Sequence, residues 1–244
     1  MAAEAGGEPL QIQCDVTRLA DLQLAADQVA RKWGGLDILV NNAGVGAAGC
    51  MDTTPLETWE RLLAVNLKSV VYSCRAFIPM FKRQKSGYIV NMASVAGIAS
   101  LPEMGCYNVS KAAVISLSET LRSELSPFDI RVSVICPAFF KSNFMDQFTA
   151  PDERQHLMAR AFFDKSRYTA EQIAQHVIRS IHKNRFYIVT QGDARLVRHL
   201  KRFFPELYLK IVTLIYKSRV LKKYPEIRET GFSMHRGDVE RRKR

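Results

Sequence analysis

The sequence lacks several features that mark other classes of protein. No run reaches the roughly 18–20 consecutive apolar residues of a membrane-spanning helix. The first residues, MAAEAGGEPLQ, have neither a basic start nor an apolar stretch, which argues against a secretory signal. The five cysteines are odd in number and show no CxxC spacing, so a reduced, cytoplasmic protein fits best. The histidines do not cluster with cysteines or carboxylates, so no metal site is expected.

The net charge of +11 is distributed unevenly along the chain. Residues 195–244 hold 15 Lys and Arg against 5 Asp and Glu, whereas the other 194 residues hold 20 against 19. The total length suffices for one α/β domain with a sizeable core. We therefore expect one domain over residues 1–194 and a basic amphipathic extension over residues 195–244.

Short apolar runs alternate with helical patterns along most of the chain, which predicts an α/β fold with a doubly wound, Rossmann-like parallel sheet. The predicted strands are 10–16, 36–41, 87–93, 130–136 and 186–189. The predicted helices are about 18–33, 55–83, 106–126 and 170–183, the second capped by Thr54, Pro55 and Glu57 and the last by Thr169 and Gln172. Residues 139–166 read as a loop with short helices after a strand's carboxyl end, where open α/β sheets bind ligands.

Tyr107 and Lys111 stand four residues apart on a predicted helix, so their side chains share one face. A phenol has a pKa near 10, and a neighbouring ammonium stabilises the phenolate and lowers that pKa. The YxxxK spacing alone is weak, because it also occurs on solvated helix faces. Ser94 at the end of one strand and Asn41-Asn42-Ala43-Gly44 at the end of another strengthen it, since strand carboxyl ends meet at one edge of a sheet.

Together, the NNAG segment 41–44, Asn66, Ser94, the Tyr107–Lys111 pair and the turn at Pro137 resemble the short-chain dehydrogenase/reductase family. The resemblance covers roughly residues 10–190. It implies a nicotinamide cofactor, NAD or NADP, and interconversion of a secondary alcohol and a ketone. Pro137-Ala138 stands where the family has Pro-Gly, and Ser142 where it usually has Thr.

The resemblance also implies roles for single residues. Tyr107 would be the general acid/base, Lys111 would lower its pKa and bind the nicotinamide ribose, Ser94 would hydrogen-bond the substrate oxygen, and Asn66 would hold a water in the proton relay. Further cofactor contacts would come from Asp15, Val16, Asn42, Gly44, Phe140 and Ser142. Taken singly, Asn66 also fits a helix-surface residue, Asp15 a turn residue and Ser94 a loop cap.

The glycine-rich phosphate loop of the family is missing. Gly44-Val45-Gly46-Ala47-Ala48-Gly49 spells GxGxxG, but no helix opens at the motif and no acidic residue follows the next strand, so it does not fit a dinucleotide fingerprint. The sequence opens on what resembles the family's third strand, and we expect the first two strands to be absent. Strand 36–41 would then have an apolar open edge unless strand 10–16 pairs with it directly. Either the sequence is an incomplete version of a longer enzyme, which we favour, or it is a shortened member with impaired cofactor binding.

Residues 195–224 combine apolar residues and Lys/Arg at helical spacing, with a break at Pro205. Three interpretations remain open: peripheral contact with an anionic membrane, a lid over a lipophilic pocket, or a helix packed on the body or on another subunit. No nucleic-acid-reading motif is present.

Two functions follow as hypotheses. The first is an NAD(P)-dependent oxidoreductase for a small, apolar alcohol or ketone, because phenylalanines are frequent in residues 139–163, and by analogy a homo-oligomer. The second is a catalytically impaired protein with the same fold that binds a partner or a membrane.

Overall fold

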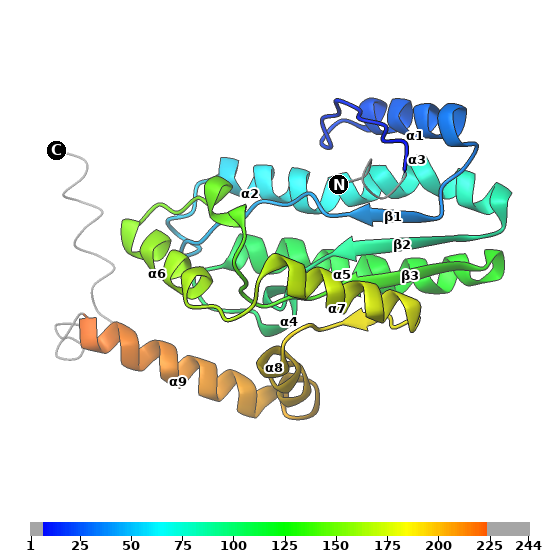
Figure 1. The fold of residues 1–244 in the computed structure, drawn as a ribbon. Coiled ribbons are helices and arrows are strands. Elements are labelled where there is room, and N and C mark those ends of the chain that lie inside the picture. The colour runs from blue at the N-terminus through cyan, green and yellow to red at the C-terminus, as the bar shows by residue number, and fades with distance from the viewer. Residues whose placement is uncertain (1–6, 224–244) are drawn as a thin grey trace, which may run out of the picture. The chain divides into compact units, whose positions relative to one another are not determined.

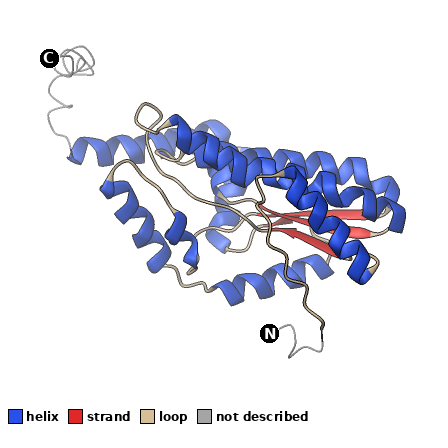
Figure 2. Ribbon diagram, turned by 90° about the horizontal axis from the view of Figure 1, so that it is seen from above, coloured by secondary structure: helices blue, strands red, loops and turns tan. Residues whose placement is uncertain are grey.

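The computed structural model describes residues 7–223. The chain divides into two compact units, the first ending at Arg198 and the second beginning at His199. The first unit contains a parallel sheet of four strands in the order β1-β2-β3-β4. The strands are β1 (Ile38–Asn41), β2 (Gly87–Met92), β3 (Ile130–Ile135) and β4 (Tyr187–Ile188). Figure 1 shows β1, β2 and β3 running side by side, and Figure 2 shows helices packed around the strands.

The sheet is covered on both faces, which confirms the predicted doubly wound, Rossmann-like fold. Ile89 and Val132 face the large core formed with the helices α1, α3 and α5, whereas Tyr88, Val90 and Ile135 face α7. This alternation follows from the two-residue period of a strand. The helices of this unit, with the two 3-10 turns and the π-helical segment, are α1 (Leu19–Trp33), α2 (Leu56–Leu63), η1 (Ala64–Lys68), α3 (Ser69–Gln84), α4 (Ala96–Ala99), α5 (Gly105–Leu125), η2 (Ser126–Phe128), η3 (Asn143–Gln147), α6 (Glu153–Asp164) and α7 (Ala170–His182).

The predicted strand Leu10–Val16 is wrong, and so is its suggested pairing with strand 36–41. Residues 7–15 have no regular structure, and Leu10 and Ile12 pack against the large core instead. A strand needs a hydrogen-bonded neighbour, whereas apolar side chains can be buried without one. The alternation of apolar and polar residues in 10–16 therefore indicates which side chains are buried and not a strand.

The described residues place β1 at one edge of the sheet, as expected from the lack of two strands. Ile38 and Val40 point to the same face as Tyr88 and Val90, their register partners in β2. They are nevertheless 45% and 51% exposed, because α7 covers only the far part of that face. The expected apolar edge is therefore confirmed.

The predicted helix 55–83 consists of α2 and α3 joined by η1, a π-helical segment with Asn66 at its centre. Its predicted capping box is wrong, because the Thr54 hydroxyl donates to the carbonyl of Cys50 and Pro55 occupies the cap position. The capping box of Thr169 and Gln172 is confirmed at the start of α7. π-Helical segments are rare, occur mostly as single turns within α-helices, and are frequently found at functional sites.

Two helices complete the described chain, α8 (Gly192–Phe203) and α9 (Pro205–Lys223). The predicted break at Pro205 is confirmed, since proline fits the first turn of a helix better than its interior. Within residues 7–223, no helix combines the length and apolar character needed to cross a membrane.

Candidate active site

Ser94, Tyr107 and Lys111 lie together at the carboxyl end of β2. Ser94 follows that strand, while Tyr107 and Lys111 share one face of α5. All three are buried, with 8%, 8% and 2% of their surface exposed. The Ser94 hydroxyl accepts a hydrogen bond from the backbone N–H of Ala96 at 3.1 Å and lies 3.5 Å from the carbonyl oxygen of Pro137, to which it donates. The serine is thereby held between the ends of β2 and β3.

Lys111 is an almost fully buried ammonium group. Its Nζ donates to the carbonyl oxygen of Met92 at 3.0 Å and lies 5.8 Å from the centre of the Tyr107 ring. Burial lowers the pKa of Lys111 from 10.5 to about 8, because the charged form loses its hydration. The site therefore contains a cation that the fold destabilises.

Burial also raises the pKa of Tyr107, to about 12, and a hydrogen bond with Ser94 only partly offsets this rise. The sequence predicted that Lys111 would lower the phenol's pKa. In this structure the loss of hydration dominates instead, and the Lys111 ammonium is bound to the Met92 carbonyl. Tyr107 is therefore a protonated phenol at neutral pH.

Two contacts fix α5 against the rest of the site. A Cβ at Gly97 would lie 2.6 Å from the carbonyl carbon of Lys111, so only glycine lets α4 pack this closely on α5. On the other side, the Asn91 side chain of β2 donates to the Ser118 hydroxyl at 2.9 Å and accepts from Asn41 of β1 at 2.8 Å. This buried polar chain ties α5 to two strands, and burial makes its loss costly.

Asn66 is fully buried at the centre of the π-helical segment. Its side-chain oxygen accepts from the N–H of Val45 at 2.8 Å, and its Nδ2 donates to the Val45 carbonyl and the Ser110 hydroxyl, each at 3.0 Å. The helix-surface alternative is therefore wrong. The Asn66 side chain therefore fixes the segment after β1 against α5.

The segment after β1 comes close to the lysine at Gly44. A Cβ there would lie 3.1 Å from the Nζ of Lys111 and 3.3 Å from the side-chain oxygen of Asn66. Asn42, two residues earlier, is exposed. The structure thus brings Gly44, Asn66 and Lys111 together, whereas Asn42 lies at the surface.

The remaining predicted cofactor residues are not all in this cluster. Asp15 lies in a turn before α1, where its carboxylate accepts from the N–H and hydroxyl of Thr17 at 2.9 and 2.7 Å. These hydrogen bonds keep the pKa of Asp15 low. Val16 and Phe140 are half-buried, and Ser142 is exposed at the start of η3, where its hydroxyl accepts from the N–H of Phe144 at 3.4 Å.

The sequence-based prediction missed the aromatic side chain that covers the tyrosine. Phe144 meets the Tyr107 ring edge to face, with 5.9 Å between ring centres, and stacks on Phe163 at 5.4 Å. A Cβ at Gly46 would lie 2.5 Å from Phe144 and 2.7 Å from Phe148, so the glycine of the rejected GxGxxG motif makes room for these rings. Phe139 joins the cluster through Phe162 and Phe163.

Two further groups hold the segments around this cluster. The buried side chain of Gln191 accepts from the N–H of Ala138 at 2.8 Å and donates to the Phe139 carbonyl at 3.3 Å, which fixes the turn after β3. The Glu103 carboxylate accepts from Arg154 at 2.6 Å and Gln155 at 2.7 Å, which ties α6 to the loop before α5. Neither Gln191 nor Glu103 could be identified from neighbouring residues in the sequence, because the hydrogen-bond partners of each lie about 50 residues away.

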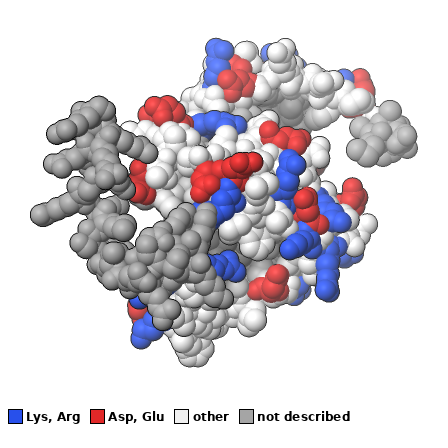
Figure 3. Space-filling model, turned by 90° about the vertical axis from the view of Figure 1, so that its left-hand side faces the viewer, with Lys and Arg blue, Asp and Glu red and all other residues white. Residues whose placement is uncertain are grey.

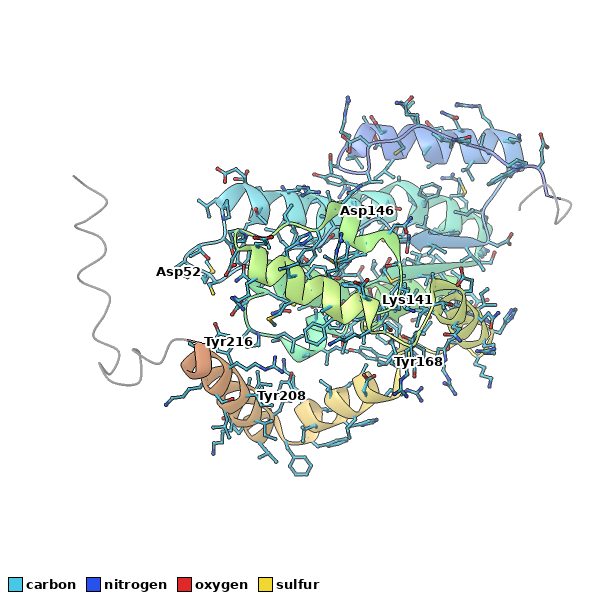
Figure 4. The ribbon with its side chains drawn as sticks, turned by 60° about the vertical axis from the view of Figure 1, so that its left-hand side comes forward. Asp52, Lys141, Asp146, Tyr168, Tyr208 and Tyr216 are labelled. Atoms are coloured by element: carbon cyan, nitrogen blue, oxygen red, sulfur yellow. The ribbon has the colours of Figure 1, made fainter. Side chains whose placement is uncertain are left out.

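A hollow of about 460 Å³ opens beside η3 and α6. Its lining combines charged and apolar side chains: Lys141, Ser142, Met145, Asp146, Arg160, Phe163 and Asp164. Figure 4 shows Lys141 near Tyr168, whose carbonyl accepts from the Lys141 N–H at 3.0 Å. Phe163 lines the hollow and stacks on Phe144, which in turn contacts the Tyr107 ring. The Phe163 ring therefore lies between the hollow and Phe144.

Charges of both signs are mixed on the face drawn in Figure 3, in line with the near-neutral balance of residues 1–194. Among the residues that the structure describes, no group of three or more His, Cys, Asp or Glu side chains could hold a metal ion.

Comparisons with known proteins identify the family. A family model described as "short chain dehydrogenase" matches residues 1–153. A 2-(R)-hydroxypropyl-CoM dehydrogenase from Xanthobacter autotrophicus is 32% identical over 173 residues, which is 69% of each chain. An inactive 2-(S)-hydroxypropyl-CoM dehydrogenase 2 from the same species is 37% identical over 181 residues, 72% of this chain and 79% of that relative.

A solved structure of a short-chain dehydrogenase/reductase from Burkholderia phymatum, in complex with NAD, superposes with a TM-score of 0.77 at 32% identity. The match covers 84% of this chain and 79% of that one. The family-model match, the sequence similarity and the superposition of the fold agree. The chain belongs to the short-chain dehydrogenase family, whose members are nicotinamide-dependent oxidoreductases.

Proposed function

We propose that this protein interconverts a small, apolar secondary alcohol and its ketone with NAD or NADP, using Tyr107 as the general acid/base. The observation that carries the proposal is the meeting of Ser94, Tyr107 and Lys111 in one buried site beneath Phe144. A tyrosine and a lysine one helical turn apart, with a serine hydroxyl beside the phenol, form an acid/base group.

The residues of the site fit the nicotinamide half of such a cofactor. Gly44 leaves open the space beside the Lys111 ammonium that a Cβ would fill, so a ribose hydroxyl could reach that cation. Ser142 and Phe140, after β3, are available to the nicotinamide ring. When bound, the cofactor supplies the hydride for reduction or accepts it in oxidation. We propose Asp15 and Val16 as adenine contacts and Asn42 as a contact to the adenosine ribose.

The protonation state of the site favours proton donation to a ketone. Tyr107 holds its proton at neutral pH, because burial raises its pKa to about 12. In reduction, the phenol would transfer this proton to the carbonyl oxygen as the hydride reaches the carbonyl carbon. The Ser94 hydroxyl would donate a hydrogen bond to the same oxygen. Lys111 would stabilise the phenolate that remains, and a water held at Asn66 would return a proton.

Aromatic side chains support an apolar substrate. Phe144 covers Tyr107, and Phe148 and Phe163 lie against Phe144. Because Phe144 packs against the Tyr107 ring, a substrate that reaches the phenol would lie close to this aromatic side chain. Apolar groups that replace these ring contacts would bind favourably.

We also propose a cytoplasmic location, in keeping with the five free cysteines, a homo-oligomeric state, and peripheral membrane contact through residues 195–224. We propose further that the sequence is a shortened form of a longer family member, as the four-stranded sheet with its exposed β1 supports.

The test is oxidation of NADH and NADPH by the 244-residue protein with a panel of aliphatic and aromatic ketones. Tyr107→Phe should lower the rate by roughly 10²–10⁴-fold. Tyr72→Phe, a half-buried tyrosine of α3 outside the site, is the matched control and should keep the rate. Full activity of Tyr107→Phe would refute the assignment.

A second function is favoured if the cofactor does not bind. One relative with 37% identity is named inactive, so the fold can persist without catalysis. Quenching of tryptophan fluorescence by NADH and NADPH measures cofactor binding directly. No quenching at millimolar cofactor, in a folded protein, would support a catalytically impaired partner- or membrane-binding protein instead.

A further inference from the structure

Three buried polar atoms of the described residues have no hydrogen-bond partner. They are the indole Nε1 of Trp59, the side-chain oxygen of Asn108 and the side-chain oxygen of Gln155. Asn108 and Gln155 are only 9% and 5% exposed. The Trp59 ring lies 3.6 Å from the position of a Cβ at Gly105, the first residue of α5. Folded proteins leave few such atoms unpaired, because each loses its hydration without gaining a hydrogen bond.

Both amide side chains are anchored to the loop 100–104, which directly precedes α5. The Nδ2 of Asn108 donates to the carbonyl oxygen of Leu101 at 2.7 Å, and the Nε2 of Gln155 donates to the carboxylate of Glu103 at 2.7 Å. Carbonyl and carboxylate oxygens only accept hydrogen bonds, so the nitrogen of each amide must face them. The unpaired atom of each side chain is therefore an oxygen that can only accept.

The loop 100–104 is held in a strained conformation. The φ angles of Ser100 and Glu103 are 56° and 58°, in the left-handed region, although neither residue is a glycine. Such residues cost free energy and are concentrated at ligand-binding and active sites. The Glu103 carbonyl accepts from the N–H of Gly49 at 2.7 Å, and its carboxylate accepts from Arg154 at 2.6 Å. The group that orients Gln155 is thus itself fixed.

Gln155 lies on the side of α6 that faces the candidate active site. Gln155, Ala159 and Phe163 follow one another at intervals of four residues and so share one side of the helix. Ala159 and Phe163 pack in one apolar cluster with Met104, and Met104 also packs in the cluster that contains Tyr107. Figure 1 shows α6 beyond the carboxyl ends of the strands. The Gln155 oxygen therefore belongs to the apolar surroundings of the catalytic tyrosine.

We propose that the side-chain oxygen of Gln155 accepts a hydrogen bond from a hydroxyl group of the substrate, remote from the carbonyl that reacts at Tyr107. The substrate class is then a ketone that is apolar except for one further hydroxyl, and Gln155 determines the specificity for it. The inference rests on the function proposed above and refines its substrate.

The chemistry of the site favours a hydroxyl over other polar groups. An amide oxygen needs a donor, so a carboxylate or a second ketone oxygen does not fit. An ammonium group would lose more hydration than a hydroxyl on entering a buried site. Water can also donate to this oxygen, and a substrate hydroxyl would take its place. Water alone would give no preference between substrates with and without the hydroxyl.

The experiment is oxidation of NADH and NADPH by the 244-residue protein with methyl alkyl ketones of increasing length. Each ketone is compared with its analogue that carries a hydroxyl at the far end of the chain. At the matching length we expect about tenfold higher kcat/KM for the hydroxylated ketone, the effect of one neutral hydrogen bond. Reduction of plain ketones with no preference at any length would overturn this proposal and leave the proposed catalysis intact.

Two variants of Gln155 separate its oxygen from its anchoring nitrogen. Gln155→Lys keeps a donor for the Glu103 carboxylate and removes the acceptor, whereas Gln155→Leu removes both. Both should abolish the preference for the hydroxylated ketone. Gln175→Leu, at an exposed glutamine of α7, is the control and should keep it. A tenfold preference that survives in Gln155→Lys, or an equal loss of rate with both ketones, would contradict the role of the oxygen.

Thermal unfolding without cofactor gives a readout that does not need activity. The hydroxylated ketone should raise the Tm of the wild type more than the plain ketone does, and Gln155→Lys should remove the difference. Equal shifts of Tm in the wild type would overturn the proposal even if the protein reduced no ketone. Failure of the hydroxyl site and failure of the proposed catalysis therefore give different results.

Discussion

Replacing the buried lysine of the site should make the protein more stable and inactive. The pKa of Lys111 falls from 10.5 to about 8 because burial removes the water around its ammonium group. At 1.36 kcal/mol for each pKa unit, keeping Lys111 charged in the fold costs about 3 kcal/mol at pH 7. Lys111→Met preserves most of the side chain's volume and removes the charge.

One loss opposes this gain. The carbonyl oxygen of Met92 accepts the Lys111 hydrogen bond at 3.0 Å, and a buried carbonyl without its donor costs about 1 kcal/mol. The net expectation at pH 7 is therefore an increase of about 2 kcal/mol in the free energy of unfolding. Such an increase would show that Lys111 destabilises the folded protein, as residues of functional sites often do.

The pH dependence has a definite sign. Between pH 8 and 10.5 the unfolded chain holds a proton on Lys111 that the folded protein has lost, so the stability of the wild type rises with pH in this window. Lys111→Met lacks this rise, and its advantage should shrink as the pH increases from 7 to 9.5.

Urea unfolding followed by circular dichroism at several pH values measures both effects. Lys68→Met, a substitution at an exposed lysine of the π-helical segment, is the control and should change stability little at any pH. A Lys111→Met variant that is less stable than the wild type at pH 7, or whose difference does not depend on pH, would refute the reasoning.

Three other substitutions address positioning and access. Asn66→Ala removes a buried amide with three hydrogen bonds and should destabilise the fold by about 2–4 kcal/mol in urea unfolding, whereas Asn42→Ala, exposed, should change it by less than about 0.5 kcal/mol. Gln191→Leu leaves two backbone groups of the turn after β3 unpaired and should cost about 2 kcal/mol, and an unchanged melting curve would contradict this. Phe144→Ala uncovers Tyr107 and should raise kcat/KM for bulky ketones relative to small ones, whereas an equal change for both would show that Phe144 does not control access.

Much of this protein is determined by local sequence. The runs 36–41, 87–93 and 130–136 are apolar enough to specify parallel strands, of which the last two are buried. The motifs at their carboxyl ends fall at one edge of the sheet because the strands are parallel. The spacing of Tyr107 and Lys111 sets their shared helix face. The break at Pro205 and the cap at Thr169 are likewise local properties of the backbone.

The tertiary structure decided what depends on neighbours distant in sequence. Leu10 and Ile12 pack against the core without a strand, because pairing requires a partner and burial does not. The pKa values of Tyr107 and Lys111 depend on the water excluded by α4, α5 and Phe144, which the YxxxK spacing cannot encode. Local patterns fix which elements form, whereas hydration, close contact and charge at the site arise only when segments far apart in the chain enclose the same small volume.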